Sequence, residues 1–171
     1  TGAGWTSSYA PPFATTQTYK FNYEYPSSGS ITGVQGAYSK AYVDSFENAL
    51  NSSTFTDTLT GWRQFAGLGS MVDFMIMQEV SHNNEAYRVN TFIYKDKSKK
   101  LHMGPLWNGE LSYANTASCN CGLDTGWCYN LGSVCGSEAK LPPFWWSKLV
   151  TDQAFMDTLK CTYHQYRQPG N

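Results

Sequence analysis

Aromatic and polar residues alternate over residues 19–25 (YKFNYEY), which predicts a β-strand because successive side chains of a strand point to opposite faces. The turn-forming residues 26–30 (PSSGS) end this strand. Directly afterwards, Thr32 and Gln35 have the spacing of a capping box, and apolar residues then recur at helical spacing. We therefore expect an amphipathic helix that ends near Leu50.

A second helix is predicted from a strongly apolar stretch, residues 71–80 (MVDFMIMQEV). Its apolar side chains cover nearly every face of a helix, which is typical of a helix buried at the centre of a domain. Ser70, with Asp73 three residues later, resembles a helix start. Polar residues follow abruptly at 81–85 (SHNNE), so we expect the helix to end there.

Residues 88–94 and 101–107 predict the two strands of a β-hairpin, joined by the charged turn KDKSKK. Trp107, at the end of the second strand, is expected in the core. Beyond a cysteine-rich loop, two prolines open a short helix (FWW), and Asp152 is placed to cap a last helix. Together the elements predict an α+β fold in which helices dominate, with one hairpin and a cysteine-rich loop.

No periodicity is visible in residues 1–17, which mix Thr, Ser, Gly and Pro with three spaced aromatic residues, Trp5, Tyr9 and Phe13. We therefore divide the chain into an extended aromatic arm or linker, residues 1–17, and a domain, residues 18–171. Three aromatic side chains are costly to leave in water. The arm either docks on its own domain, docks on a neighbouring molecule, or is a disordered end, and the pattern does not decide among these.

Composition excludes several classes of protein. The chain has 171 residues, enough for one domain with a real core, and charged residues make up 15% of it with a net charge of −1. This balance gives no electrostatic reason to expect nucleic acid or an anionic membrane as partner. No apolar run approaches the roughly 18 residues of a membrane span. We expect a soluble single domain.

The cysteines suggest the compartment. Cys119, Cys121, Cys128 and Cys135 lie close together in a polar, glycine-rich stretch. Such clustering indicates zinc or disulfides, but zinc sites usually contain C-x₂-C pairs, so we favour disulfides. The sequon that begins at Asn51 is an acceptor for N-glycosylation. Disulfides and a glycosylation site both predict a secreted or extracellular glycoprotein.

One group of polar residues could carry chemistry. Phosphoryl transfer of the protein-kinase type uses a carboxylate as base, an Asn five residues later that binds metal, and a metal-binding acid after a short hairpin. Glu85 and Asn90 have this spacing, and the predicted hairpin would bring Asn108 and Glu110 back toward them. On spacing alone, ordinary polar residues at a helix end are the better interpretation.

Three segments, SFENALNSSTF (45–55), residues 70–115 and LPPFWWSKLVTDQAFMDTLKC (141–161), resemble the CotH family. These are atypical secreted or spore-coat protein kinases, and CotH-like domains also occur in other large extracellular proteins. The resemblance runs from about Tyr19 to Arg167, and it is most specific from Asp73 to Asn115. It implies a kinase-like fold of which this chain resembles the C-terminal part, because only a short stretch precedes the first strand.

The resemblance also assigns roles to residues, with departures from the family pattern. Glu85 stands where the family has its catalytic Asp, and Asn108 stands where it has its principal metal-binding Asp. The resemblance implies that Asn90, Asn108 and Glu110 would bind ATP with Mg²⁺ or Mn²⁺ in an active member. A neutral amide at position 108 weakens such a site, since carboxylates mainly hold and offset the charge of a hard cation.

Three functions follow. The favoured hypothesis is a non-catalytic pseudokinase, used as a structural or assembly module that binds an extracellular protein or associates with itself through the N-terminal arm. The second is ATP- and metal-dependent phosphorylation of Ser or Thr, with Glu85 as base. The third is a glycan- or calcium-binding module, in which oxygen ligands for calcium would come from Asn83, Asn84, Glu85, Asn108 and Glu110.

Overall fold

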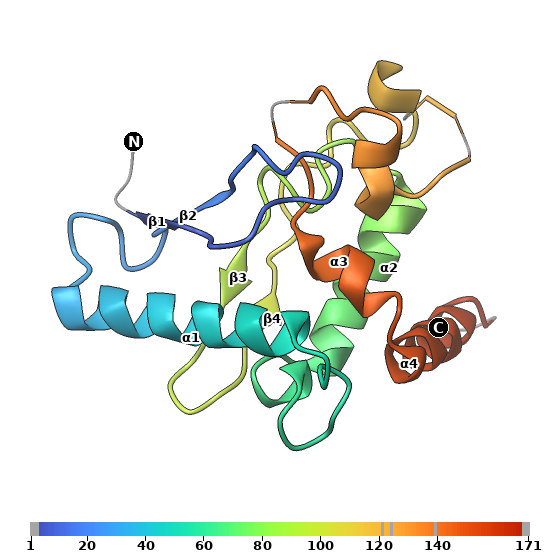
Figure 1. Cartoon of the computed structure of the whole chain (residues 1–171). Helices are drawn as coiled ribbons and strands as arrows, with labels where there is room; N and C mark the ends of the chain where they lie inside the picture. The colour runs from blue at the N-terminus through green and yellow to red at the C-terminus, as the bar shows by residue number, and fades with distance from the viewer. Residues whose placement is uncertain (1–3, 121, 124, 139, 169–171) are drawn as a thin grey trace.

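The computed structural model of the chain describes residues 4–120, 122–123, 125–138 and 140–168 (Figure 1). Four α-helices, three 3₁₀ helices and four short strands follow one another in this part of the chain. In order they are β1 (Gly4–Thr6), β2 (Lys20–Asn22), α1 (Gly33–Asn51), η1 (Trp62–Gln64), α2 (Leu68–Ser81), β3 (Ile93–Tyr94), β4 (His102–Met103), η2 (Ser118–Asn120), η3 (Cys128–Ser133), α3 (Phe144–Leu149) and α4 (Gln153–Tyr166).

The predicted α+β class with dominant helices is confirmed. The described strands form two antiparallel pairs, β1 with β2 and β3 with β4. Both strand predictions were too long, because β2 occupies three residues of the expected seven and the hairpin pairs only Ile93 with Met103 and Tyr94 with His102. The residues freed from the hairpin form the loops that carry the candidate site described below.

Helix α1 begins as its sequence predicts. The side chain of Thr32 accepts a hydrogen bond from the backbone N–H of Gln35 at 3.2 Å, and the side chain of Gln35 accepts one from the backbone N–H of Thr32 at 2.9 Å. This reciprocal pair satisfies two N–H groups that the first helical turn leaves without partners. One face of α1 then enters the core through Val43, Phe46 and Leu50.

Helix α2 begins two residues before the predicted start. Ser70 does not cap it; its hydroxyl instead accepts a hydrogen bond from Met103 N at 2.8 Å and donates to Met103 O at 3.4 Å, which fastens α2 to β4. The prediction of a helix buried all round was wrong for Met77 and Val80, which are 45% and 54% exposed. The opposite face packs in the core, and α2 contacts both α4 and β4.

The N-terminal residues pack on their own chain. Trp5 of β1 lies 5.0 Å from Phe21 of β2 between ring centroids, and Phe21 in turn lies 5.9 Å from Trp145 of α3. Ser7 donates a hydrogen bond to the carboxylate of Glu47 on α1 at 2.8 Å. Residues 4–22 therefore form a strap across α1 and α3, whose strand pair lies above α1 in Figure 1.

A buried carboxylate joins the strap to the core. Glu47 is fully buried and accepts hydrogen bonds from Ser7 Oγ, from Tyr19 Oη at 2.7 Å and from Trp145 Nε1 at 2.9 Å. Burial raises the pKa of Glu47, and the three donors only partly offset that effect. The carboxylate thus links α1, α3 and both ends of the strap through one residue.

A second buried carboxylate closes the C-terminal part. Asp152 accepts hydrogen bonds from the backbone N–H groups of Ala154 and Phe155, as a helix cap should, and from Trp62 Nε1 at 2.9 Å. It also pairs with the Arg63 guanidinium at 2.6 Å. Burial pushes the pKa of Asp152 upward, but the bonds from Arg63 and Trp62 outweigh it and hold the pKa below its ordinary value.

None of the helices in the described residues is long and apolar enough to cross a bilayer.

Candidate functional site

The four residues predicted to form a site lie together. Glu85 Oε2 accepts hydrogen bonds from Asn90 Nδ2 at 3.1 Å and from Asn108 Nδ2 at 3.4 Å. Asn108 Nδ2 also lies 3.5 Å from Glu110 Oε1. We call Glu85, Asn90, Asn108 and Glu110 the amide–carboxylate cluster. The short β3–β4 pair returns the chain to the loop after α2, as the predicted hairpin requires.

The loop that carries Glu85 is shaped by buried amides. His82 ends α2 in the left-handed conformation, at φ 47°, and the chain then turns. Asn83 donates to Gln78 Oε1 at 3.1 Å, and its own side-chain oxygen accepts from the backbone N–H of Glu85 at 3.1 Å. Both amide side chains are buried, so this pair fixes the loop from inside.

The backbone at two cluster residues suits asparagine. Asn90 and Asn108 both have a positive φ, of 52° and 55°. Asn visits this left-handed region more readily than most other residues, because its short polar side chain can hydrogen-bond locally. The two amides are therefore held at turns by a backbone conformation that favours their residue type.

The cluster contains two carboxylates, and the side chains that contact them are uncharged amides. A carboxylate accepts hydrogen bonds and donates none, and the contacts from Asn90 and Asn108 come from their NH₂ groups. In the described part of the chain, no lysine or arginine forms an ion pair with either glutamate. Asn108 thus places its amide NH₂ group between the two carboxylates.

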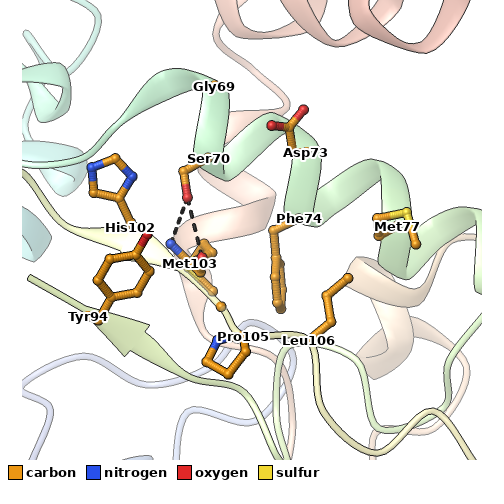
Figure 2. Close-up of a pocket in the computed structure, with 11 residues that line it drawn as sticks. Gly69, Ser70, Asp73, Phe74, Met77, Tyr94, His102, Met103, Pro105 and Leu106 are labelled. Atoms are coloured by element: carbon orange, nitrogen blue, oxygen red, sulfur yellow. Dashed lines mark hydrogen bonds between the residues drawn. The ribbon is translucent and has the colours of Figure 1, made fainter. Parts of the chain in front are cut away.

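A groove lies between α2 and the β3–β4 pair (Figure 2). It has a volume of about 490 Å³, with Met77 and Leu106 facing each other at one end and Tyr94 stacked on His102 at the other. Ser70 points into it but is bonded to the Met103 backbone, and Asp73 accepts a hydrogen bond from Tyr166. Ser70, His102 and Asp73 line the groove without forming a hydrogen-bonded relay among the described residues.

Comparison with known families identifies the chain. The family model described as CotH kinase protein matches residues 10–168, which is nearly the whole sequence. The chain belongs to the CotH family. None of the curated proteins and none of the solved structures is similar enough to count as a match.

Family membership confirms the resemblance seen in the sequence and extends it toward the N-terminus, into the strap. Glu85 and Asn108, which the sequence resemblance predicts to stand in place of two aspartates, are in direct contact in this CotH domain.

Sequence reasoning missed the arginine that holds the loop. Arg88 donates through Nε to Asn84 O at 2.9 Å and through Nη2 to Asn84 Oδ1 at 3.2 Å. Its Nη1 donates to Glu138 Oε2 and to Lys140 O, both at 2.9 Å. The side-chain oxygen of Asn84 thus accepts a hydrogen bond from Arg88, and that of Asn83 accepts one from the Glu85 N–H.

A second missed residue is Glu79, near the end of α2. It accepts hydrogen bonds from Tyr87 Oη at 2.7 Å and from the backbone N–H groups of Cys128 and Tyr129 at 2.8 and 2.9 Å. Burial raises the pKa of Glu79 against the effect of these donors. Burial and the Glu79 charge also raise the pKa of Tyr87 far above its ordinary value. Glu79 therefore joins the candidate-site loop to η3.

The remaining predicted sites have mixed outcomes. Cys119 and Cys135 form a disulfide, Cys128 is buried, and Cys121 falls outside the described residues. Asn51, the predicted glycosylation acceptor, is the exposed last residue of α1. The prediction that Trp107 lies in the core was wrong: it is 64% exposed, because β4 ends at Met103 and the alternation of the expected strand stops there.

Proposed function

We propose that this CotH domain is a non-catalytic module that binds another protein within an extracellular assembly. The observation that carries the proposal is the contact of Asn108 with Glu85 and Glu110. An active phosphoryl-transfer site concentrates carboxylates so that a divalent cation can be held and can neutralise phosphate charge. Here the side chain between the two carboxylates is an uncharged amide, which donates hydrogen bonds but adds no negative charge to attract a cation.

The surface supports a binding role. Several large apolar side chains are exposed on the loops beside the cluster and on the free face of α2. They are Met77, Val80, Leu106, Trp107, Tyr113 and Trp127. Aromatic residues and Met are enriched at protein–protein interfaces, where Trp and Tyr combine a large apolar face with a polar handle. The same aromatic faces would suit a glycan, which is the second class of partner.

The extracellular location rests on separate features. CotH proteins include spore-coat components, and a disulfide between Cys119 and Cys135 persists in an oxidising environment. Asn51 stands exposed at the end of a helix, where an oligosaccharide would point away from the domain. Because residues 4–22 already pack on their own chain, we place self-association, if the domain assembles, at the exposed apolar face rather than at the strap.

Thermal unfolding with ATP, with Mn²⁺ and with both together tests the proposal. A ligand present at 100 times its Kd would stabilise the fold by about 2.7 kcal/mol, which is a shift of several degrees in Tm for a chain of this size. We expect no shift that requires both ligands. A joint shift that disappears in Glu85→Gln would overturn the proposal, while Asn48→Asp serves as a control for unspecific cation binding.

Protein phosphorylation remains the second candidate, because all four residues implied by the family resemblance do converge. In that case Glu85 is the base, and Asn90, Asn108 and Glu110 surround the metal. Incubation with ATP labelled on its γ-phosphate and a Ser- and Thr-rich protein distinguishes the two. Label transfer by the parent chain, lost in Glu85→Gln and kept in Asn48→Asp, would establish catalysis.

A further inference from the structure

The side chain of Glu138 connects the disulfide to the loop of the candidate site. Its Oε1 lies 3.6 Å from Cys119 Sγ, and its Oε2 accepts the hydrogen bond from Arg88 Nη1 at 2.9 Å. One atom each from Cys119, Cys135 and Glu138 all lie within 4.8 Å of one another. Two sulfurs and a carboxylate at this separation are potential ligands of a single metal ion.

We propose that reduction of the Cys119–Cys135 disulfide creates a zinc site from Cys119, Cys135 and Glu138, with Arg88 holding the carboxylate in place. Thiolate sulfur and carboxylate oxygen are both ordinary zinc ligands, and a water completes a tetrahedral site that has three protein ligands. The clustered cysteines of the sequence thus serve as a disulfide in one redox state and as metal ligands in the other.

The backbone already places the ligands for this purpose. The Cα atoms of Cys119 and Cys135 are 5.4 Å apart. Zn–S bonds of about 2.3 Å set the sulfurs of a tetrahedral site roughly 3.8 Å apart, which rotation about the Cα–Cβ bonds can supply at this Cα spacing. The turn in which Glu138 N donates to Cys135 O at 3.0 Å keeps the carboxylate beside the sulfurs.

Arg88 supports the carboxylate from the side away from the sulfurs. Its side chain is only 7% exposed, and it is fixed by further bonds to Asn84 and to Lys140 O. Ligating carboxylates are commonly hydrogen-bonded in this way, and loss of such a partner typically lowers metal affinity 10- to 100-fold. Positive charge on Arg88 also offsets part of the excess negative charge of two thiolates and one carboxylate around Zn²⁺.

The chemistry balances with a dithiol as reductant. Thiolate attack opens the Cys119–Cys135 bond, the dithiol supplies two electrons and two protons, and it leaves as its own disulfide. Zn²⁺ then displaces the protons of Cys119 and Cys135 as the two Zn–S bonds form, and these protons pass to solvent. Glu138 binds in its ionised form, so no further proton is released.

Zinc binding to the full chain tests this site and is independent of the proposed function, since neither ATP nor a partner enters the measurement. The chain is reduced with a phosphine under anaerobic conditions, equilibrated with Zn²⁺, desalted and assayed for bound metal. We expect one zinc in the reduced chain and none in the oxidised chain. Co²⁺ in place of zinc should give thiolate-to-metal absorption only after reduction.

Variants locate the ligands. Cys135→Ser should abolish binding, and Glu138→Gln and Arg88→Met should each weaken it at least tenfold. Glu24→Gln, a matched loss of charge at an exposed residue outside both sites, should have no effect. Cys121→Ser should keep the zinc. Absence of zinc in the folded reduced chain, or affinity unchanged by Glu138→Gln, would refute the site. Circular dichroism monitors folding; if Cys135→Ser fails to fold, alkylation of the reduced parent chain replaces it.

Discussion

Replacing Asn108 with Asp tests whether the Asn108 amide stabilises the two carboxylates of the amide–carboxylate cluster. The parent side chain donates to Glu85 at 3.4 Å and approaches Glu110 at 3.5 Å. An aspartate has nearly the same shape but no hydrogen-bond donor. The substitution would therefore add a third carboxylate beside Glu85 and Glu110 and remove the amide that both of them contact. Without metal, the variant should be less stable than the parent chain, and a divalent cation should bind to the new acidic group.

The expected size of the loss follows from these contacts. A hydrogen bond of ordinary strength contributes about 0.5–1.5 kcal/mol, but these two are long and one is exposed, so together they contribute about 1 kcal/mol. Repulsion between like charges acts in the same direction, reduced by solvent because Glu110 is exposed. For a chain of this size, each kcal/mol corresponds to about 2–4 °C in Tm. We therefore expect Asn108→Asp to lower Tm by about 2–4 °C, and Mn²⁺ at 100 times its Kd to stabilise the variant by about 2.7 kcal/mol.

Urea and thermal unfolding of both chains, with and without Mn²⁺, provide the measurement. Asn48→Asp is the matched control: it changes the net charge equally but lies on α1, where its side chain only accepts a hydrogen bond from Tyr9. Equal stabilisation of the parent chain and Asn108→Asp by Mn²⁺ would show that the amide does not replace a cation. A variant as stable as the parent without metal would show that the hydrogen bonds contribute nothing.

Three further predictions concern stability and modification. Asp152→Ala removes a helix cap and leaves the buried Trp62 Nε1 without its acceptor. In urea titrations it should lower the free energy of unfolding by about 3–6 kcal/mol. The control Asp157→Ala, at an exposed position on α4, should change this free energy by less than about 0.5 kcal/mol. Because the pKa of Glu47 is raised, the folded state keeps this proton to higher pH than the unfolded state does. The stability of the parent chain, measured relative to Glu47→Gln, should therefore fall as the pH rises above 4.5. An increase in this relative stability over the same range would contradict the reasoning. Asn51→Gln should abolish the gel shift that a glycan-releasing amidase causes in chain secreted from eukaryotic cells, and an unmodified parent chain would disprove the acceptor.

Local signals in the sequence were sufficient for the helix caps. Thr32 and Asp152 bond to backbone groups two or three residues away, so spacing alone reveals them. Ser70 has the same residue type as a cap, but its hydroxyl bonds to Met103 across the fold, and no local pattern contains that partner. Strand β1 was also missed, because three residues become a strand only when β2 lies beside them.

The residues of the candidate site also differ in whether the sequence could predict them. The interval between Glu85 and Asn90 and the predicted hairpin raised the possibility that the four cluster residues meet, as they do. On spacing alone ordinary polar residues at a helix end were favoured, and the resemblance to the CotH family singled the four residues out. Arg88 and Glu79 could not be anticipated, since their partners at Glu138 and Cys128 lie 50 and 49 residues further along the chain. Both occupy positions where an exposed charged residue would have been an equally reasonable interpretation.

The strap and its partners determine the order in which the domain can form during synthesis. Trp145 donates a hydrogen bond to Glu47, which precedes it by 98 residues. The backbone oxygen of Glu138 accepts one from Gln17, which precedes it by 121 residues. Contacts at such sequence separation form late and slow folding, because a long loop must close first. While the ribosome is still making α3, Glu47 lacks the hydrogen bond from Trp145 and Phe21 lacks the Trp145 ring that covers it. A nascent chain of this domain therefore presents exposed aromatic surface until α3 emerges, and it should depend on chaperones most during that interval.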